Sequence, residues 1–280
     1  YHRIKMKILI FSDLDGTFLN HNDYSYSDLK KFISKIKKKS EIIFSSSKTF
    51  SEIRKICKKI NINFPFIVEN GACIYFPKNY FNFKQIHQKI IEYQNFIGLP
   101  IGSNNLRKLK DQIDKNFKKD FKFSFFSELN DKKIAKITNL KIKDVADSKK
   151  RQFSDPIYWK DTNKNLKLFK KQVKEKKIII SEGGRFIHLD VDYDKGKAVQ
   201  KFLEIYKNQK SKSLLTISLG DSENDISMLE LTNYSCCIKS SPKKKLCLKK
   251  SFNIYYSVKE APLGWKESLE FIFKKENVNF

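Results

Sequence analysis

Two aspartates one residue apart, Asp13 and Asp15, follow an apolar run near the start of the chain, in the sequence KILIFSDLDGT at residues 7–17. Carboxylates this close repel each other unless a cation lies near them. Mg²⁺ prefers carboxylate and carbonyl oxygens as ligands, so this pair predicts a magnesium site at the end of a buried strand. A solvated turn that caps a helix is the alternative, because Asp and Gly are common in such turns.

A second acidic group follows another apolar run, where the strand expected at residues 214–219 ends in the sequence GDSEND. In open α/β sheets ligands bind at the carboxyl ends of the strands. If the two apolar runs are neighbouring strands, Asp221 and Asp225 face Asp13 and Asp15 across one crevice. A helix N-cap is the alternative for GDSEND, but it does not explain why three acids cluster there.

Hydroxyl and basic groups follow the strand expected at residues 41–45. Ser46, Ser47 and Lys48 precede a helix expected at residues 49–60. Hydroxyl and backbone N–H groups at a helix start can bind phosphate. They can equally cap the helix, and the residues alone favour neither interpretation. Lys195 opens a further helix, expected at residues 195–206, but it is one of many lysines.

The order of the expected elements predicts a doubly wound, Rossmann-like parallel sheet with an inserted domain. Strands alternate with helices up to about residue 76, residues 83–97 have helical character, and short strands and helices of mixed α+β type follow. We therefore expect a first part of the core domain at residues 6–82, an inserted α+β cap at residues 83–190 and a second part of the core at residues 191–280.

Composition excludes several classes of protein. The 280 residues are 40% hydrophobic, which is enough for a folded core. Neither a membrane-spanning run nor a signal peptide is expected, so we expect a cytoplasmic protein with no membrane partner. Residues 1–5 precede a methionine and resemble an upstream extension, and five scattered cysteines indicate neither a zinc site nor a disulfide framework.

The net charge of +26 raises nucleic acid or an anionic membrane as possible partners. The lysines, however, are spread along the whole chain, which favours a solvated basic surface and no specific nucleic-acid partner. Such a surface would also attract a small anionic substrate.

The motifs also resemble those of a known family. DLDGT, Ser46 with Lys48, Lys195 in DKGKA, and GDSEND resemble, in this order, the four motifs of haloacid dehalogenase-type phosphatases. Five further segments resemble mannosyl-3-phosphoglycerate phosphatases within that group: SSKT (46–49), PFIVENGA (65–72), KKRQFSDP (149–156), GGRFIHL (183–189) and APLGWKES (261–268).

This resemblance implies a Mg²⁺-dependent phosphatase acting on a small phosphorylated sugar acid. Asp13 would be the nucleophile and Asp15 the general acid and base, while Ser46 and Lys195 would hold the phosphoryl group. The implied ligands of Mg²⁺ are Asp13, the carbonyl of Asp15, Asp221 and Asp225.

Eight residues are implied to bind the rest of the substrate: Ser47, Lys48, Glu69, Asn70, Arg151, Ser154, Arg185 and His188. The two arginines are candidates for a substrate carboxylate, because a guanidinium can donate two parallel hydrogen bonds to it. Structural hydrogen bonding is the alternative for each cap residue. A glucosyl-3-phosphoglycerate or sucrose phosphate phosphatase, and a basic nucleic-acid-binding protein on the same fold, are the alternative functions.

Overall fold

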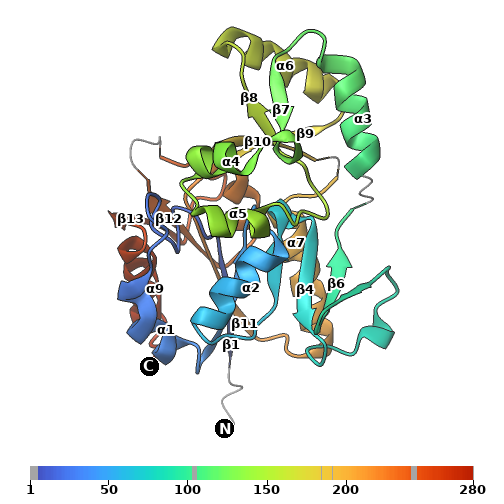
Figure 1. Cartoon of the computed structure of the whole chain (residues 1–280). Helices are drawn as coiled ribbons and strands as arrows, with labels where there is room; N and C mark the ends of the chain where they lie inside the picture. Colours follow the sequence, from blue (N-terminus) through green and yellow to red (C-terminus); the bar gives the residue numbers. More distant parts are fainter. Residues whose placement is uncertain (1–5, 103–105, 184, 191, 241–244, 280) are drawn as a thin grey trace.

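A computed structural model of the chain describes residues 6–102, 106–183, 185–190, 192–240 and 245–279. The described part consists of a core with a nine-stranded sheet and a cap with a four-stranded sheet above it (Figure 1). Residues 1–5, predicted to be an upstream extension, and Gly184 of the GGRFIHL segment lie outside the described residues.

The strands of the core sheet are β1 (Lys7–Ser12), β2 (Ser40–Ser45), β3 (Phe66–Val68), β4 (Cys73–Pro77), β5 (Ile91–Tyr93), β6 (Phe96–Pro100), β11 (Leu214–Gly220), β12 (Tyr234–Lys239) and β13 (Ile254–Glu260). Their spatial order is β13-β12-β11-β1-β2-β3-β4-β6-β5. The strands from β13 to β3 in this order are parallel, and β4, β6 and β5 extend the sheet by antiparallel pairing. The predicted parallel sheet is therefore confirmed, and β1 lies near its middle.

Helices cover both faces of this sheet. They are α1 (Lys30–Ile36), α2 (Phe50–Lys59) and α9 (Leu263–Lys275) on one face, and α7 (Lys195–Gln209) and α8 (Ile226–Leu229) on the other. Ile8 and Ile10 of β1 pack with the first group, whereas Leu9 and Phe11 pack with the second. Burial on both faces explains why β1 is apolar without a break from Ile8 to Phe11, as expected for a parallel strand.

The prediction of a helix at residues 83–97 is wrong. This stretch forms a single turn of 3₁₀ helix at Phe83–Gln85 and then β5 and β6, which pair with each other, while β6 also pairs with β4. A Cβ atom at Gly98 would lie 2.7 Å from Cγ1 of Ile91 and 2.8 Å from Cε1 of Tyr75, so close packing between strands decides the local structure. Because both strands extend the core sheet, we propose that the cap begins after Pro100 and not at residue 83.

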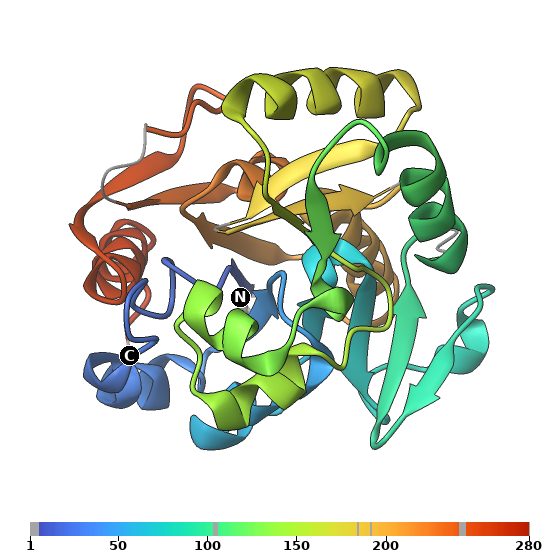
Figure 2. The ribbon, with the colours of Figure 1, turned by 45° about the horizontal axis from the view of Figure 1, so that its top comes forward.

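The cap sheet is antiparallel, with strand order β7-β8-β10-β9. Its elements are α3 (Leu106–Phe117), β7 (Phe123–Phe125), α4 (Asp131–Thr138), α5 (Ile142–Ser148), β8 (Ile157–Trp159), α6 (Asn163–Glu175), β9 (Ile179–Gly183) and β10 (Phe186–Asp190). Helices α3 and α6 pack on the sheet through one apolar cluster, while α4 and α5 lie between the cap sheet and the core (Figure 2).

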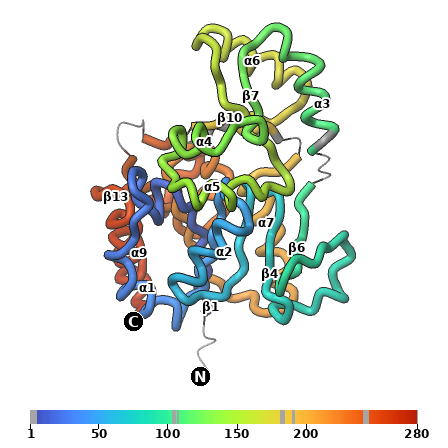
Figure 3. The backbone as a smooth tube through the Cα atoms, in the orientation of Figure 1, coloured from blue at the N-terminus to red at the C-terminus, as the bar shows by residue number. Residues whose placement is uncertain are grey.

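The backbone passes from β6 into the cap and returns to the core at α7 (Figure 3). The cap therefore lies over the end of the core sheet where β1 and β11 finish. Among the described residues, no helix combines the length and apolar character needed to cross a membrane.

Candidate active site

Asp13 and Asp221 lie side by side because they follow neighbouring strands. β1 and β11 are parallel, with Ser12 opposite Leu219, and each aspartate is the first or second residue beyond this pair. Gly16 has φ +83°, and a Cβ atom there would lie 2.8 Å from Oδ2 of Asp221. Only glycine permits this approach without strain. The two acidic strand ends meet as predicted, with Asp13, Asp221 and Asp225 in one group, but the carboxylate of Asp15 is not part of that group.

Three buried carboxylates, from Asp13, Asp221 and Asp225, offer oxygen atoms that all lie within 4.8 Å of one another. Lys195 enters this cluster from the start of α7. Its Nζ lies 2.6 Å from Oδ1 of Asp13 and 2.7 Å from Oδ1 of Asp225. The other oxygen of Asp225 accepts the N–H groups of Asp221 and Ser222 at 3.0 Å, so this residue both caps the 3₁₀ turn Glu223–Asp225 and belongs to the cluster.

The electrostatics of the cluster favour an additional cation. Burial raises the pKa of Asp13 to about 8, and the carboxylates of Asp225 and Asp221 add to the rise, although Lys195 opposes it. Burial alone would lower the pKa of Lys195, but its two carboxylate partners raise it above the usual range, so it stays charged. One ammonium group cannot balance three carboxylates. A divalent cation fits this set of oxygen ligands and would hold Asp13 in its ionised form.

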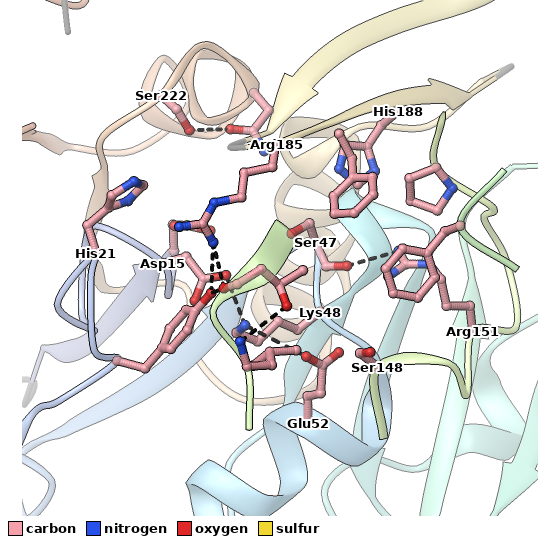
Figure 4. A pocket seen from close by; sticks show the side chains of 18 residues that line it. Asp15, His21, Ser47, Lys48, Glu52, Ser148, Arg151, Arg185, His188 and Ser222 are labelled. Atoms are coloured by element: carbon pink, nitrogen blue, oxygen red, sulfur yellow. Dashed lines mark hydrogen bonds and ion pairs between the residues drawn. The ribbon is translucent and has the colours of Figure 1, made fainter. Parts of the chain in front are cut away.

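The side chain of Asp15 lies in a pocket under the cap that Asp13 also lines (Figure 4). Its Oδ2 lies 2.9 Å from Nζ of Lys48, whose pKa is raised because Asp15 and Glu52 more than offset its burial. Among the described residues, Oδ1 of Asp15 is buried with no hydrogen-bond partner. The carboxylate of Asp15 is thus separate from the three-acid cluster, and only its main-chain carbonyl remains as the predicted metal ligand.

Helix α2 is capped by Thr49, not by the residues before it. Thr49 Oγ1 accepts the N–H of Glu52 at 3.3 Å, and the Glu52 carboxylate accepts the N–H of Thr49 at 2.9 Å. The alternative interpretation, in which Ser46 and Ser47 cap this helix, is therefore wrong. Ser46 is buried directly after β2, beside β1, and its Oγ accepts the N–H of Lys48 at 3.3 Å.

Three predicted substrate-binding residues, Glu69, Arg151 and Ser154, contact one another across the boundary between core and cap. The buried Glu69 carboxylate accepts the N–H groups of Gln152, Phe153 and Ser154 at 2.8–3.1 Å, and the Ser154 hydroxyl at 2.7 Å. Arg151 donates to Ser154 Oγ at 2.7 Å and to the Ser47 carbonyl at 3.0 Å. Glu69 thus joins the cap to the core, whereas Arg151 also lines the pocket.

The remaining predicted residues divide between two places. Arg185 lies in the turn before β10 and His188 in β10, and both line the pocket together with Ser47, Lys48 and Arg151 (Figure 4). Burial lowers the pKa of His188 to about 3, with help from Arg151 and Lys195, so it is a neutral group at physiological pH. Asn70 lies outside this pocket, and its Oδ1 accepts from Nδ2 of Asn224 at 3.1 Å.

Sequence reasoning missed several residues that line the pocket, namely His21, Tyr24, Phe126, Thr138, Phe186 and Asn224. Phe186 and Asn224 lie inside recognised segments, so position in a motif could have identified them. Tyr24 and Thr138 lie in no such segment, and only the three-dimensional contact between core and cap brings them together.

Comparisons with known proteins agree with this geometry. Residues 10–248 match the haloacid dehalogenase-like hydrolase family. The chain belongs to this family. It is therefore a hydrolase, and the resemblance seen in the motifs is confirmed. Two proteins named glucosyl-3-phosphoglycerate/mannosyl-3-phosphoglycerate phosphatase are similar to it over nearly their whole length. The one from Persephonella marina is 35% identical over 94% of this chain and 96% of its own, and the one from Methanococcoides burtonii is 31% identical over 97% and 99%.

The fold of this hydrolase is also found in solved structures. The sucrose-phosphatase of Synechocystis, solved with sucrose and phosphate, has a TM-score of 0.61 at 13% identity, over 96% of this chain and 98% of its own. At this level of identity, the likeness concerns the fold alone.

Proposed function

We propose that this hydrolase is a Mg²⁺-dependent phosphatase that releases phosphate from mannosyl-3-phosphoglycerate and leaves mannosylglycerate, a compatible solute. The observation that supports it most is the buried group of Asp13, Lys195, Asp221 and Asp225 at the carboxyl ends of two parallel strands. The shared name of two relatives at 35% and 31% identity supports the choice of a glycosyl-3-phosphoglycerate as substrate.

In this proposal Asp13 is the nucleophile. One of its oxygens bonds to phosphorus as the bond from phosphorus to the glycerate oxygen breaks, giving an aspartyl-phosphate. Water then attacks the same phosphorus, the bond from phosphorus to Asp13 breaks, and free phosphate and the original carboxylate result. Lys195 and Ser46 hold the phosphoryl oxygens in both steps.

Asp15 is the proposed general acid and base. It gives a proton to the leaving glycerate oxygen in the first step and takes one from water in the second. Lys48 holds Oδ2, so the buried Oδ1, which has no partner among the described residues, is the atom that we propose carries the proton.

Magnesium would be held by Asp13, Asp221, Asp225 and the Asp15 carbonyl, and when bound it supplies positive charge that offsets the repulsion between carboxylate and phosphate. The pocket under the cap would bind the glycosyl and glycerate parts, with Arg151 and Arg185 as partners for the carboxylate and His188 for a hydroxyl.

A substrate panel tests this proposal. Phosphate release would be measured with Mg²⁺ from mannosyl-3-phosphoglycerate, glucosyl-3-phosphoglycerate, sucrose phosphate and free 3-phosphoglycerate. We expect the highest kcat/KM for the mannosyl compound. Preference for the glucosyl compound would change the sugar, preference for sucrose phosphate would overturn the substrate class, and no release from any of them would overturn the phosphatase assignment.

A further inference from the structure

Tyr24 occupies an unusual backbone conformation in the loop that follows the Asp13 motif. It has φ +58°, which is rare for a bulky residue and costs about 1–3 kcal/mol. The loop is closed by its own hydrogen bonds, from Asn20 N–H to the Ser25 carbonyl at 2.9 Å and from Tyr24 N–H to the Asn20 carbonyl at 3.1 Å. A conformation of this cost persists only where other contacts determine it, so the contacts of the Tyr24 side chain are informative.

The Tyr24 hydroxyl joins the core to the cap. It donates to the main-chain carbonyl of Thr138, the last residue of α4, and it accepts from Nη1 of Arg185 at 3.3 Å. The same Nη1 donates to the Thr138 carbonyl at 2.6 Å. A carbonyl at a helix C-terminus lacks a partner within its helix and favours a cation nearby. Tyr24 and Arg185 thus satisfy one orphan group of the cap together.

The same side chain contacts the catalytic side of the pocket. The Lys48 ammonium lies 5.0 Å from the centre of the Tyr24 ring, and it pairs with Asp15 at 2.9 Å. Tyr24, Thr138, Arg185 and Lys48 all line the pocket. Burial, assisted by the nearby Asp15, raises the pKa of Tyr24, so its hydroxyl keeps the proton that it donates to Thr138.

We propose that Tyr24 is a positioning residue that fastens the cap over the pocket and holds Arg185 in the pocket wall. One end of the Arg185 side chain is fixed by the Tyr24 hydroxyl and the Thr138 carbonyl, which reduces the rotamer entropy that the arginine would lose on binding an anionic group. Tyr24 therefore favours substrates large enough to reach the cap. The identity of that substrate rests on the proposed function, but the contact between core and cap does not.

The variant Tyr24→Phe tests this role, because it removes the hydroxyl and keeps the ring beside Lys48. Tyr26→Phe is the matched control, since Tyr26 ends the same loop, stacks on Phe18 at 5.6 Å and is not part of the pocket lining. The measured quantity is kcat/KM for mannosyl-3-phosphoglycerate divided by kcat/KM for p-nitrophenyl phosphate. Tyr24→Phe should lower this ratio about tenfold, the equivalent of one hydrogen bond to a charged group. Tyr26→Phe should leave it unchanged.

Amide hydrogen exchange in the full-length protein without substrate provides a second readout. Tyr24→Phe should speed exchange in α4 and α5 by about tenfold relative to wild type and Tyr26→Phe. An unchanged ratio or unchanged exchange in Tyr24→Phe would overturn the proposed role. If wild type releases phosphate from p-nitrophenyl phosphate but not from glycosyl-phosphoglycerates, the proposed substrate is wrong, and exchange alone then decides the role of Tyr24.

Discussion

Glu69→Gln should weaken the attachment of the cap to the core. The Glu69 side chain is 1% exposed. Its Oε2 accepts three hydrogen bonds, from the N–H groups of Phe153 and Ser154 and the Ser154 hydroxyl, and its Oε1 accepts the N–H of Gln152. Glutamine keeps the shape of the glutamate side chain, but its amide group has one oxygen where the carboxylate has two. Its best orientation keeps the three-bonded oxygen and turns the NH₂ group toward the N–H of Gln152, so two donors face each other.

The expected cost follows from these contacts. A hydrogen bond to a charged group contributes about 1.5–3 kcal/mol, and a buried donor left without an acceptor costs about 1–3 kcal/mol. The substitution also removes the negative charge beside the Arg151 guanidinium, whose Nε lies 3.8 Å from Oε2 of Glu69. We therefore expect the free energy of opening at residues 152–154 to fall by about 2–4 kcal/mol, which corresponds to a rise of about 30-fold or more in amide exchange.

Amide exchange with fragment-level resolution over residues 149–156 is the assay, with Glu128→Gln as the control. Glu128 is an exposed cap residue that accepts one N–H, from Phe125 at 3.1 Å, and pairs with Lys118. The control variant Glu128→Gln should change the rate of amide exchange at residues 152–154 by less than about threefold. If Glu69→Gln also changes exchange there by less than threefold, the carboxylate does not anchor the cap and the reasoning is refuted.

Three further predictions concern single residues. In the folded protein burial lowers the pKa of His188 to about 3, so this side chain stays neutral. In the unfolded chain it gains a proton below about pH 6.5, and the protein therefore loses stability as the pH falls from about 6.5 toward 3. Between pH 7 and pH 5, urea titrations should show that the free energy of unfolding falls by about 2 kcal/mol more for wild type than for His188→Gln. Equal losses would show that His188 is not held neutral in the folded protein. Gly16→Ala should cut phosphate release at least about tenfold, because its Cβ would displace Asp221; unchanged activity would show that the loop can move aside. Arg185→Lys should raise KM more for glycosyl-phosphoglycerates than for p-nitrophenyl phosphate, because lysine cannot donate two parallel hydrogen bonds, and an equal rise would argue against a binding role.

Local sequence patterns predicted the acidic end of the core sheet because its determinants are local. An apolar strand followed by Asp, Gly and Thr fixes the place of Asp13, and a second apolar strand ending in GDSEND fixes that of Asp221. The sequence left open whether these two strands are neighbours, and the structure shows that they are. On that condition the acid cluster could be predicted without knowing the cap.

Contacts between distant segments could not be predicted in this way. The hydrogen bonds between Glu69 and residues 152–154 span more than 80 positions, and nothing near Glu69 in the sequence indicates them. Residues 83–97 have apolar side chains at helical spacing, yet the pairing of β6 with β4 and β5, with close packing at Gly98, places two strands there. In both places contacts between distant segments determine the structure. A local sequence pattern contains only one of the two segments that form each contact, so it cannot predict the contact.

The proposed roles of Asp13 and Mg²⁺ are tested by measuring phosphate release by wild type and Asp13→Asn, with Mg²⁺ and after its removal by chelation. Mannosyl-3-phosphoglycerate is the substrate, and circular dichroism confirms that the variant is folded. We expect release by wild type only with Mg²⁺ and none by Asp13→Asn under either condition. Substantial release by the folded variant would rule out Asp13 as the nucleophile, and equal release by wild type with and without the metal would rule out the role of Mg²⁺.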